Sequence, residues 1–348
     1  MTVSYHERPG VYTDFTASSV YAAEGAGKAV GLAAVSQAQA GLYTLYSLDD
    51  AGAFSADTKL SCMLRLLFLN GAGKVLVCPV AQQSVAAYSD AFTQLLSTRE
   101  ARVLLCDSAD AQVASALKTA VETAQLAKNE CVAVFGSAAQ NDTARIAEAA
   151  VVNSARVVVA APESYCSGVE EKSAAYTAAA VAGLVAGQDD PALPLGGAAL
   201  KGLTAVDTVW TEDELDRLIC GGVTPLEAQG GGVLIVRGVS SKTTENGVPD
   251  TTWKEFTTIL TVDDVITGVR SSLQRRFTRA KNNPQTRSAI RDQVVIELES
   301  RVRRQIIEHY GDLSVTANGE DPTVCDVIFS FGICHGLSHI LLTAHITV

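Results

Sequence analysis

The chain has 348 residues, of which 47% are hydrophobic and 19% are charged, and its formal net charge is -11. This length and composition predict two or three domains with a large buried core. The acidic balance disfavours nucleic-acid binding, and no apolar run approaches the ~20 residues of a membrane-spanning helix, so we expect no direct membrane insertion.

The first residues read MTVSYHERPGVYTDF. Proline fixes one backbone angle and glycine frees the next, so Arg8-Pro9-Gly10 predicts a bend that projects an extended arm, residues 1–22. The β-prone run behind this bend adjoins no core-forming pattern, so we expect it to pair with a sheet of a neighbouring copy. The predicted inter-subunit strand consists of Val11, Tyr12, Thr13, Asp14 and Phe15.

Apolar strands and longer helices alternate over the next part of the chain. Fully apolar strands separated by helices predict a parallel sheet that is covered on both faces. The predicted strands are residues 28–36, 74–80, 102–106, 131–136 and 156–162, and the predicted helices are residues 55–69, 85–96, 111–127, 143–153 and 172–186. Residues 23–245 are therefore interpreted as an α/β domain, and its buried cysteines are typical of a protein made in a reducing cytoplasm.

The pattern changes towards the C-terminus. The α/β domain closes with a Pro- and Gly-rich connection, a capped helix, a strand and a polar loop, predicted at 187–202, 211–222, 233–239 and 240–253. Residues 246–334 are interpreted as a smaller α+β domain. Its predicted elements are a strand-like run at 255–262, basic helices at about 263–281 and 285–310, and a strand at 325–334. A second closing strand, 339–348, falls within a C-terminal arm, residues 335–348.

The sequence GAGK occurs twice, at residues 25–28 and 71–74. A phosphate-binding loop of the Walker type also needs an earlier glycine, and a Ser or Thr after the lysine to bind magnesium. Both copies fail at both positions, where the residues are Ala22 and Ala29 in the first copy and Phe68 and Val75 in the second. We therefore predict turns and no nucleotide cofactor.

The search for an enzyme site gives no motif. No G-x-S-x-G sequence is present, and all five histidines lie towards the two ends of the chain. A Ser, His and Asp set assembled from distant loops stays open, because such triads are defined by geometry. An α/β hydrolase-like or nucleotide-binding enzyme is the main alternative, and it requires a polar pocket at the carboxyl ends of the strands. A non-contractile oligomeric shell protein is a second alternative.

The C-terminal residues Cys334, His335, His339 and His345 form the best metal candidate. The three histidines share a parity and would face one side of a continuous strand. No second pair of ligands has zinc-site spacing, however, and Gly336 interrupts the strand. We therefore predict no metal, and interpret the histidines as residues of a half-exposed strand at an interface.

Basic residues concentrate in one stretch. Residues 265–310 contain ten basic and four acidic residues, a net charge of +6, which leaves -17 for the rest of the chain. A free surface normally mixes both signs, so this stretch favours contact with an acidic protein partner. The candidate contact residues are Arg270, Arg275, Arg276, Arg279, Arg301, Arg303 and Arg304.

The chain also ends on the β-prone sequence HILLTAHITV, which is suited to strand addition in a neighbouring copy. The second predicted inter-subunit strand comprises Ile340, Leu341, Leu342, Thr343, Ala344, His345 and Ile346.

Taken together, several motifs resemble the tail sheath proteins of contractile phages and of related prophage or tailocin particles. The resemblance covers nearly the whole chain and rests on ERPGVYTDF, MLRLLFLNGAGKVLVCPV, LPLGGAALKGLTAVD, TEDELDRLICGGVTPLE, GGGVLIVRGVSSKTTENG and DVITGVRSSLQRRFTRAKNN. The order of the middle motifs is more specific than any one of them.

This resemblance implies a fold and a function. It implies a parallel-sheet, subtilisin-like domain without a protease site, and stacked hexameric rings around a tail tube. It further implies that the N- and C-terminal arms join sheets of adjacent subunits, that contraction drives the tube through a target envelope, and that baseplate and terminator proteins are partners. The expected location is the tail sheath of a virion or particle assembled in the host cytoplasm.

Overall fold

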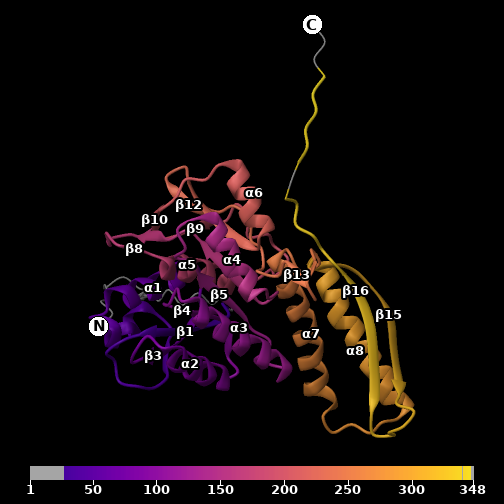
Figure 1. Ribbon diagram of the computed structural model, residues 1–348. Helices are drawn as coiled ribbons and strands as arrows, with labels where there is room; N and C mark the ends of the chain where they lie inside the picture. Colours follow the sequence, from indigo (N-terminus) through magenta and orange to yellow (C-terminus); the bar gives the residue numbers. More distant parts are fainter. Residues whose placement is uncertain (1–26, 339, 346–348) are drawn as a thin grey trace, which may run out of the picture.

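The structure is a computed structural model that describes residues 27–338 and 340–345. A large α/β part, built around one sheet, is followed by a smaller C-terminal part that lies at its side (Figure 1). Among the described residues, no helix is both long and apolar enough to span a lipid bilayer.

A nine-stranded sheet organises the large part. Its six central strands are mutually parallel and its edge strands are antiparallel to their neighbours. From edge to edge, the strands are β2 (Tyr43–Leu45), β3 (Lys74–Val80), β1 (Ala29–Val35), β4 (Ala101–Cys106), β5 (Val132–Gly136), β6 (Val157–Ala161), β11 (Val223–Gln229), β12 (Gly232–Ile235) and β9 (Ala199–Leu200). The predicted parallel sheet is confirmed.

Each face of this sheet has its own hydrophobic core, because successive side chains of a strand point to opposite faces. In β4, Val103 and Leu105 belong to one core, whereas Leu104 and Cys106 belong to the other. The first face is covered by α1 (Thr58–Leu69), α5 (Ala174–Gly187) and the start of α7, and the second by α2 (Val85–Ser97), α3 (Ala111–Leu126) and α4 (Asp142–Val152).

Side-chain caps fix where the helices begin. Each cap accepts a hydrogen bond from a backbone N–H of the first turn, which would otherwise lack a partner. The capping residues are Asp57 (α1), Ser84 (α2), Asp110 (α3), Asn141 (α4), Ser173 (α5) and Thr211, which caps α6 (Glu212–Cys220). Helix α5 is rich in alanine because it is buried on nearly all sides against the sheet and α1.

Short elements complete the large part. They are a 3-10 helix η1 (Leu48–Phe54), an antiparallel sheet of β10 (Leu203–Val206), β7 (Ser164–Cys166) and β8 (Lys172–Ser173), and a hairpin of β13 (Thr244–Glu245) and β14 (Val248–Pro249).

The C-terminal part consists of two long helices and a hairpin. These are α7 (Phe256–Phe277), α8 (Pro284–Arg303), β15 (Ile307–Ala317) and β16 (Cys325–Ile333). A small core joins them, to which α7 contributes Val265 and α8 contributes Leu298. Phe329 and Phe331 of β16 stack with ring centroids 6.2 Å apart and pack against this core.

Two sequence predictions for this part are wrong. Residues 255–262 do not form a strand but begin α7, because Phe256, Ile259 and Leu260 have helical spacing and pack into the first core of the large sheet. The second basic helix stops at Arg303, where Gln305 adopts a left-handed conformation (φ 59°), and β15 follows. Residues 340–345 form no strand within the single chain, so the predicted inter-subunit strand, residues 340–346, stays a prediction.

Candidate assembly surfaces

The second GAGK sequence meets the described end of the first, Gly27 and Lys28, and the glycines there permit close backbone packing. A Cβ atom on Gly27 would lie 2.6 Å from the backbone nitrogen of Gly73, and one on Gly71 would lie 2.8 Å from the Cα atom of Gly187. Gly71 also has a φ of 114°, which side chains disfavour. These contacts join the entry to β1, the turn before β3 and the end of α5, and they explain the motif without a phosphate.

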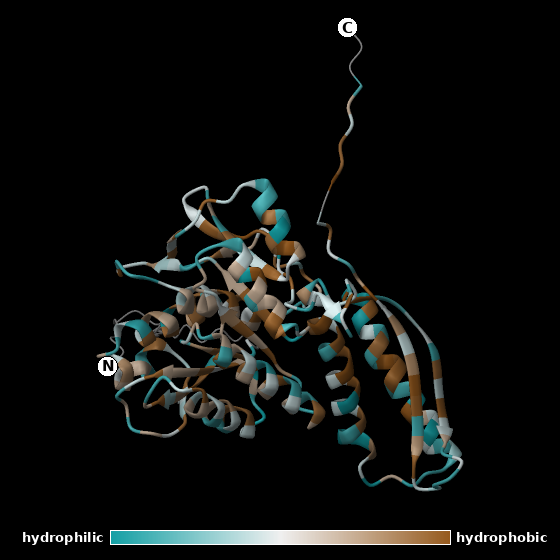
Figure 2. Ribbon diagram, in the orientation of Figure 1, coloured by the Kyte–Doolittle hydropathy of each residue, from teal (hydrophilic) through white to brown (hydrophobic). Residues whose placement is uncertain are grey.

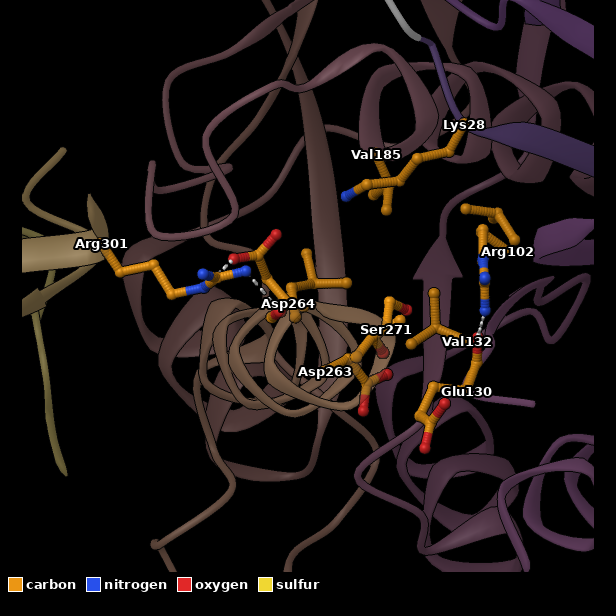
Figure 3. Close-up of a pocket in the computed structure, with 13 residues that line it drawn as sticks. Lys28, Arg102, Glu130, Val132, Val185, Asp263, Asp264, Ser271 and Arg301 are labelled. Atoms are coloured by element: carbon orange, nitrogen blue, oxygen red, sulfur yellow. Dashed lines mark hydrogen bonds and ion pairs between the residues drawn. The ribbon is translucent and has the colours of Figure 1, made fainter. Parts of the chain in front are cut away.

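The lysines of the two sequences face acidic groups. Lys74 forms an ion pair with Glu100 (2.5 Å). Lys28 lines a cavity of about 270 Å³ between the large sheet and α7, with Asp263 and Asp264 across from it (Figure 3). Burial lowers the pKa of Lys28, and these carboxylates oppose that effect only in part.

This cavity lies at the amino ends of the parallel strands, since Lys28 and Arg102 stand at the starts of β1 and β4, and Glu130 shortly precedes β5. Ligand sites of open α/β sheets lie at the opposite, carboxyl edge. The cavity is therefore a junction between the two parts of the chain, and its position does not support the enzyme alternative.

Three ion pairs surround the junction. Arg156 binds Asp263 and Arg270 binds Glu130 (2.6 Å), and both pairs connect the large part to α7. Arg301 of α8 binds Asp264 (2.9 Å) within the C-terminal part. The acidic groups of the junction are thus already paired with arginines of the same chain.

The carboxyl edge of the sheet contains a polar hollow of about 310 Å³, lined by Lys59, Asp107 and Glu163 among others. The phenol of Tyr88 donates a 2.5 Å hydrogen bond to Asp107, which holds this carboxylate against the core. No histidine occurs between residues 7 and 308, so the hollow contains none from these strands or helices. A triad-type site has no imidazole here.

The histidines of the C-terminal metal candidate are described only in part. His335 and His345 are exposed on an irregular segment, and His339 lies outside the described residues. Within residues 27–338 and 340–345, no three His, Cys, Asp or Glu side chains are placed to share a metal ion.

The seven candidate arginines divide into two groups in the structure. Arg270 and Arg301 are used within the chain, in the ion pairs above, and Arg301 is only 8% exposed. The remaining five are exposed: Arg275, Arg276, Arg279, Arg303 and Arg304.

These five arginines occupy opposite ends of the helical pair, because α8 runs back along α7. Arg275, Arg276 and Arg279 lie at the end of α7, where Arg276 donates to Gln293 of α8. Arg303 and Arg304 lie at the far end of α8, and Arg304 donates to the carbonyl oxygen of Asp189 (3.1 Å). The structure therefore presents two separate basic patches.

The hairpin of β15 and β16 has two open edges. In the described part of the chain each strand pairs only with the other, so the outward N–H and C=O groups of both strands have no ladder partner there. Exposed strand edges are templates for pairing with another chain.

An exposed apolar segment follows the hairpin. Leu337, Ile340, Leu341 and Leu342 are 75%, 79%, 96% and 89% exposed. The segment extends away from the body, and its apolar stretch is coloured brown in Figure 2. Such a concentration of exposed apolar side chains indicates a surface that is covered in an assembly. The predicted N-terminal strand, residues 11–15, lies outside the described residues.

Sequence reasoning missed β15 and the ion pairs at the junction. The alternating polar and apolar residues of Leu313–Ala317 are a strand signal within β15. The pairs carry no local signal, because Arg156 and Asp263 are far apart in the sequence.

Comparisons with known proteins agree on one family. The profile of the phage tail sheath protein central domain matches residues 81–241, and that of the phage tail sheath C-terminal domain matches residues 248–347. The tail sheath protein of Bacillus phage SP01 is 31% identical over 257 residues, which is 70% of this chain but only 42% of the phage protein.

Solved structures share the fold. A chain of the anti-feeding prophage baseplate, determined with sixfold symmetry, has a TM-score of 0.77 at 16% identity and covers 99% of this chain and 100% of its own length. A chain of the contracted helical sheath of the same particle has a TM-score of 0.72 at 16% identity, covering 98% of this chain and 99% of its own.

Proposed function

Because this chain belongs to the phage tail sheath protein family, we propose that it is the structural subunit of a contractile tail sheath. The subunits would polymerise as stacked hexameric rings around a tail tube, and contraction would drive the tube through a target envelope. The observation that carries this proposal is that one chain has both a hairpin with two open strand edges and an exposed apolar segment at its C-terminal end.

Strand exchange would link the subunits. The edges of β15 and β16 would accept the predicted strands of neighbouring copies, residues 11–15 and 340–346. Each new ladder hydrogen bond contributes ~1 kcal/mol net, so a strand of five residues adds several kcal/mol per contact. Two such segments per chain make the lattice multivalent.

The large part would have a structural role without catalysis. We propose that it has the subtilisin-like, non-catalytic fold implied by the resemblance, and the parallel sheet with helices on both faces supports this. Among the described residues, no histidine lines the hollow at the carboxyl edge, and the cavity beside Lys28 lies at the amino edge, which supports a non-enzymatic subunit without cofactors.

The proposed partners are other copies of the chain, the tail tube protein, and baseplate and terminator proteins. The two exposed basic patches, Arg275 to Arg279 and Arg303 to Arg304, are the candidate tube contacts, since charged surfaces orient a partner more than they add affinity. The proposed location is the tail sheath of a virion or particle that is assembled in the host cytoplasm.

Electron microscopy of the purified full chain, alone and with its tube protein, tests the proposal. We expect tubes with a wide bore, and we expect none from a variant that lacks residues 335–345, whose side chains are outside the core. Closed shells without a bore would favour the shell alternative. A chain that stays monomeric with its tube protein would contradict the proposal.

A further inference from the structure

Helix α1 and strand β7 bring two cysteines into one place in the core. Cys62 of α1 and Cys166 of β7 are 7% and 1% exposed and belong to the same hydrophobic cluster, together with Tyr176. Burial, and after it the neighbouring Cys166 thiol, raise the pKa of Cys62 to about 11. The two thiols are therefore neighbours in the core.

An arginine is directed at this pair. Arg65 follows Cys62 by one turn of α1, and its Nη2 atom donates a 3.1 Å hydrogen bond to the Sγ atom of Cys166 and another to the carbonyl oxygen of Ser167. A guanidinium beside a sulfur atom favours the thiolate, which is the nucleophilic form of cysteine.

The other buried cysteines lack this arrangement. Among the described residues, no arginine donates to the sulfur atom of Cys78, Cys106 or Cys131. Burial raises the pKa of Cys106 and of Cys131 to about 12, which favours their unreactive thiol forms. Arg65 thus distinguishes one cysteine pair from the remaining buried thiols.

We propose that Cys62 and Cys166 are a redox pair that closes to a reversible disulfide when the protein meets a peroxide. The Cys166 sulfur attacks one peroxide oxygen and becomes a sulfenic acid, while the other oxygen leaves as water. The Cys62 sulfur then attacks the sulfenic sulfur, loses its proton and expels the hydroxyl group as a second water. One peroxide takes two electrons and two hydrogens from the two thiols.

The bond would join α1, which covers the large sheet, to the small sheet of β10, β7 and β8. It would close a loop of about a hundred residues, and long loops gain most from a cross-link in the chain-entropy description. The chain would fold with free thiols in a reducing compartment and be stiffened covalently after exposure to an oxidising medium.

Peptide mapping of the full chain tests this. Exposed Cys220 is first replaced by serine, to prevent cross-links between molecules. The protein is treated with hydrogen peroxide, its remaining thiols are alkylated, and the peptides are identified by mass spectrometry without reduction. We expect a peptide that links Cys62 to Cys166, and a melting temperature that rises by several degrees and returns after dithiothreitol.

Variants separate this pair from general oxidation. C62S and C166S should each abolish the linked peptide, whereas C78S, at a comparably buried cysteine, should leave it unchanged. R65Q should slow its formation about tenfold, and R65K should restore part of the rate. The absence of the link in the folded parent, an equal rate of cross-linking at other cysteines, or an unchanged rate in R65Q would overturn the proposal.

Discussion

The guanidinium of Arg156 donates two hydrogen bonds, of 2.7 and 2.8 Å, to the carboxylate of Asp263. This contact links the residue just before β6 to helix α7. Arg156 is 4% exposed. Because a bidentate ion pair fixes direction as well as distance, this contact helps to set the orientation of the C-terminal helices relative to the large sheet.

The first prediction concerns this pair. Asp263→Asn leaves the guanidinium of Arg156 buried without its counter-charge, so we expect the free energy of unfolding to fall by about 3 kcal/mol in urea titrations. The double variant Arg156→Met, Asp263→Leu should lose less, because no buried charge remains. The control Asp292→Asn, at an exposed acid of α8, should change stability by under about 0.5 kcal/mol. Equal losses in D263N and D292N would show that the pair does not stabilise the fold.

The second prediction concerns Glu130. Burial raises the pKa of this carboxyl, but the hydrogen bond and charge of Arg270, together with a backbone hydrogen bond and the charge of Arg102, outweigh burial and hold the pKa below its ordinary value of 4.5. A depressed pKa in the folded state contributes stability above the unfolded value and loses it as the pH falls through the folded value. Arg270→Met should therefore cost about 2 kcal/mol at pH 7 and progressively less towards pH 4 and below, where Glu130 becomes neutral.

Urea titrations of R270M across this pH range are the measurement, with Arg275→Met as the exposed control on the same helix. A loss that stays constant with pH would exclude Glu130 as the partner.

The third prediction tests close packing at Gly136, at the end of β5. A Cβ atom there would lie 2.0 Å from the carbonyl oxygen of Ala174, a backbone atom of the first, buried residue of α5. Gly136→Ala should cost about 3 kcal/mol or more, or prevent folding. Gly52→Ala, with no atom within 4 Å of the added methyl group, is the matched control and should melt within a few degrees of the parent. Similar melting of the two variants would contradict the packing at the α5 start.

The fourth prediction concerns the tube. Replacement of Arg275, Arg276 and Arg279 by glutamate should reduce co-sedimentation with the tube protein several-fold and weaken its salt dependence, since exposed charge contacts are screened by salt. The monomer should keep its melting temperature. Lys201→Glu, an exposed charge reversal on the large part, should co-sediment like the parent. If the triple variant does so as well, the contact moves to Arg303 and Arg304 or is absent.

The fifth prediction concerns the two proposed exchanged strands. Proline removes a ladder donor, so Tyr12→Pro and Leu341→Pro should each prevent or loosen polymerisation. Leu341 is 96% exposed, and its replacement should leave the melting temperature of the monomer within about 1 °C of the parent value. Thermal melts and electron microscopy of the same samples give both readings. Polymers as regular as those of the parent would argue against exchange through that strand.

Local patterns sufficed for much of the large part. Apolar runs of strand length and capped helices are short-range signals, and the structure has both where they were expected. Strand β11 was not predicted, because its sequence VTPLEAQ contains Pro225 and proline usually interrupts strands. The strand nevertheless pairs in parallel with β6. The C-terminal part was harder, because five of the six residues 257–262 are β-branched and favour strands locally, but they lie in a helix whose face packs on a distant sheet.

Contacts between distant residues were beyond sequence reasoning. The stretch around Arg270 and Arg301 had the composition of a binding surface, but both side chains are paired inside the chain with Glu130 and Asp264. A single sequence states how many charges a helix has. It does not state which of them meet a partner after folding.

The two-stranded form of the β15–β16 hairpin has an arithmetic consequence. A ribbon of two strands has two edges, and under the proposed exchange each subunit also donates two segments. The number of open edges therefore equals the number of donated segments, and away from the ends of the lattice every edge can be paired. Unmatched edges and unmatched donors would then remain only at the first and last rings, in a number set by the ring and independent of the length of the tube. A long sheath would expose no more adhesive surface than a short one, and its two ends would be the natural sites for proteins that start and stop its growth.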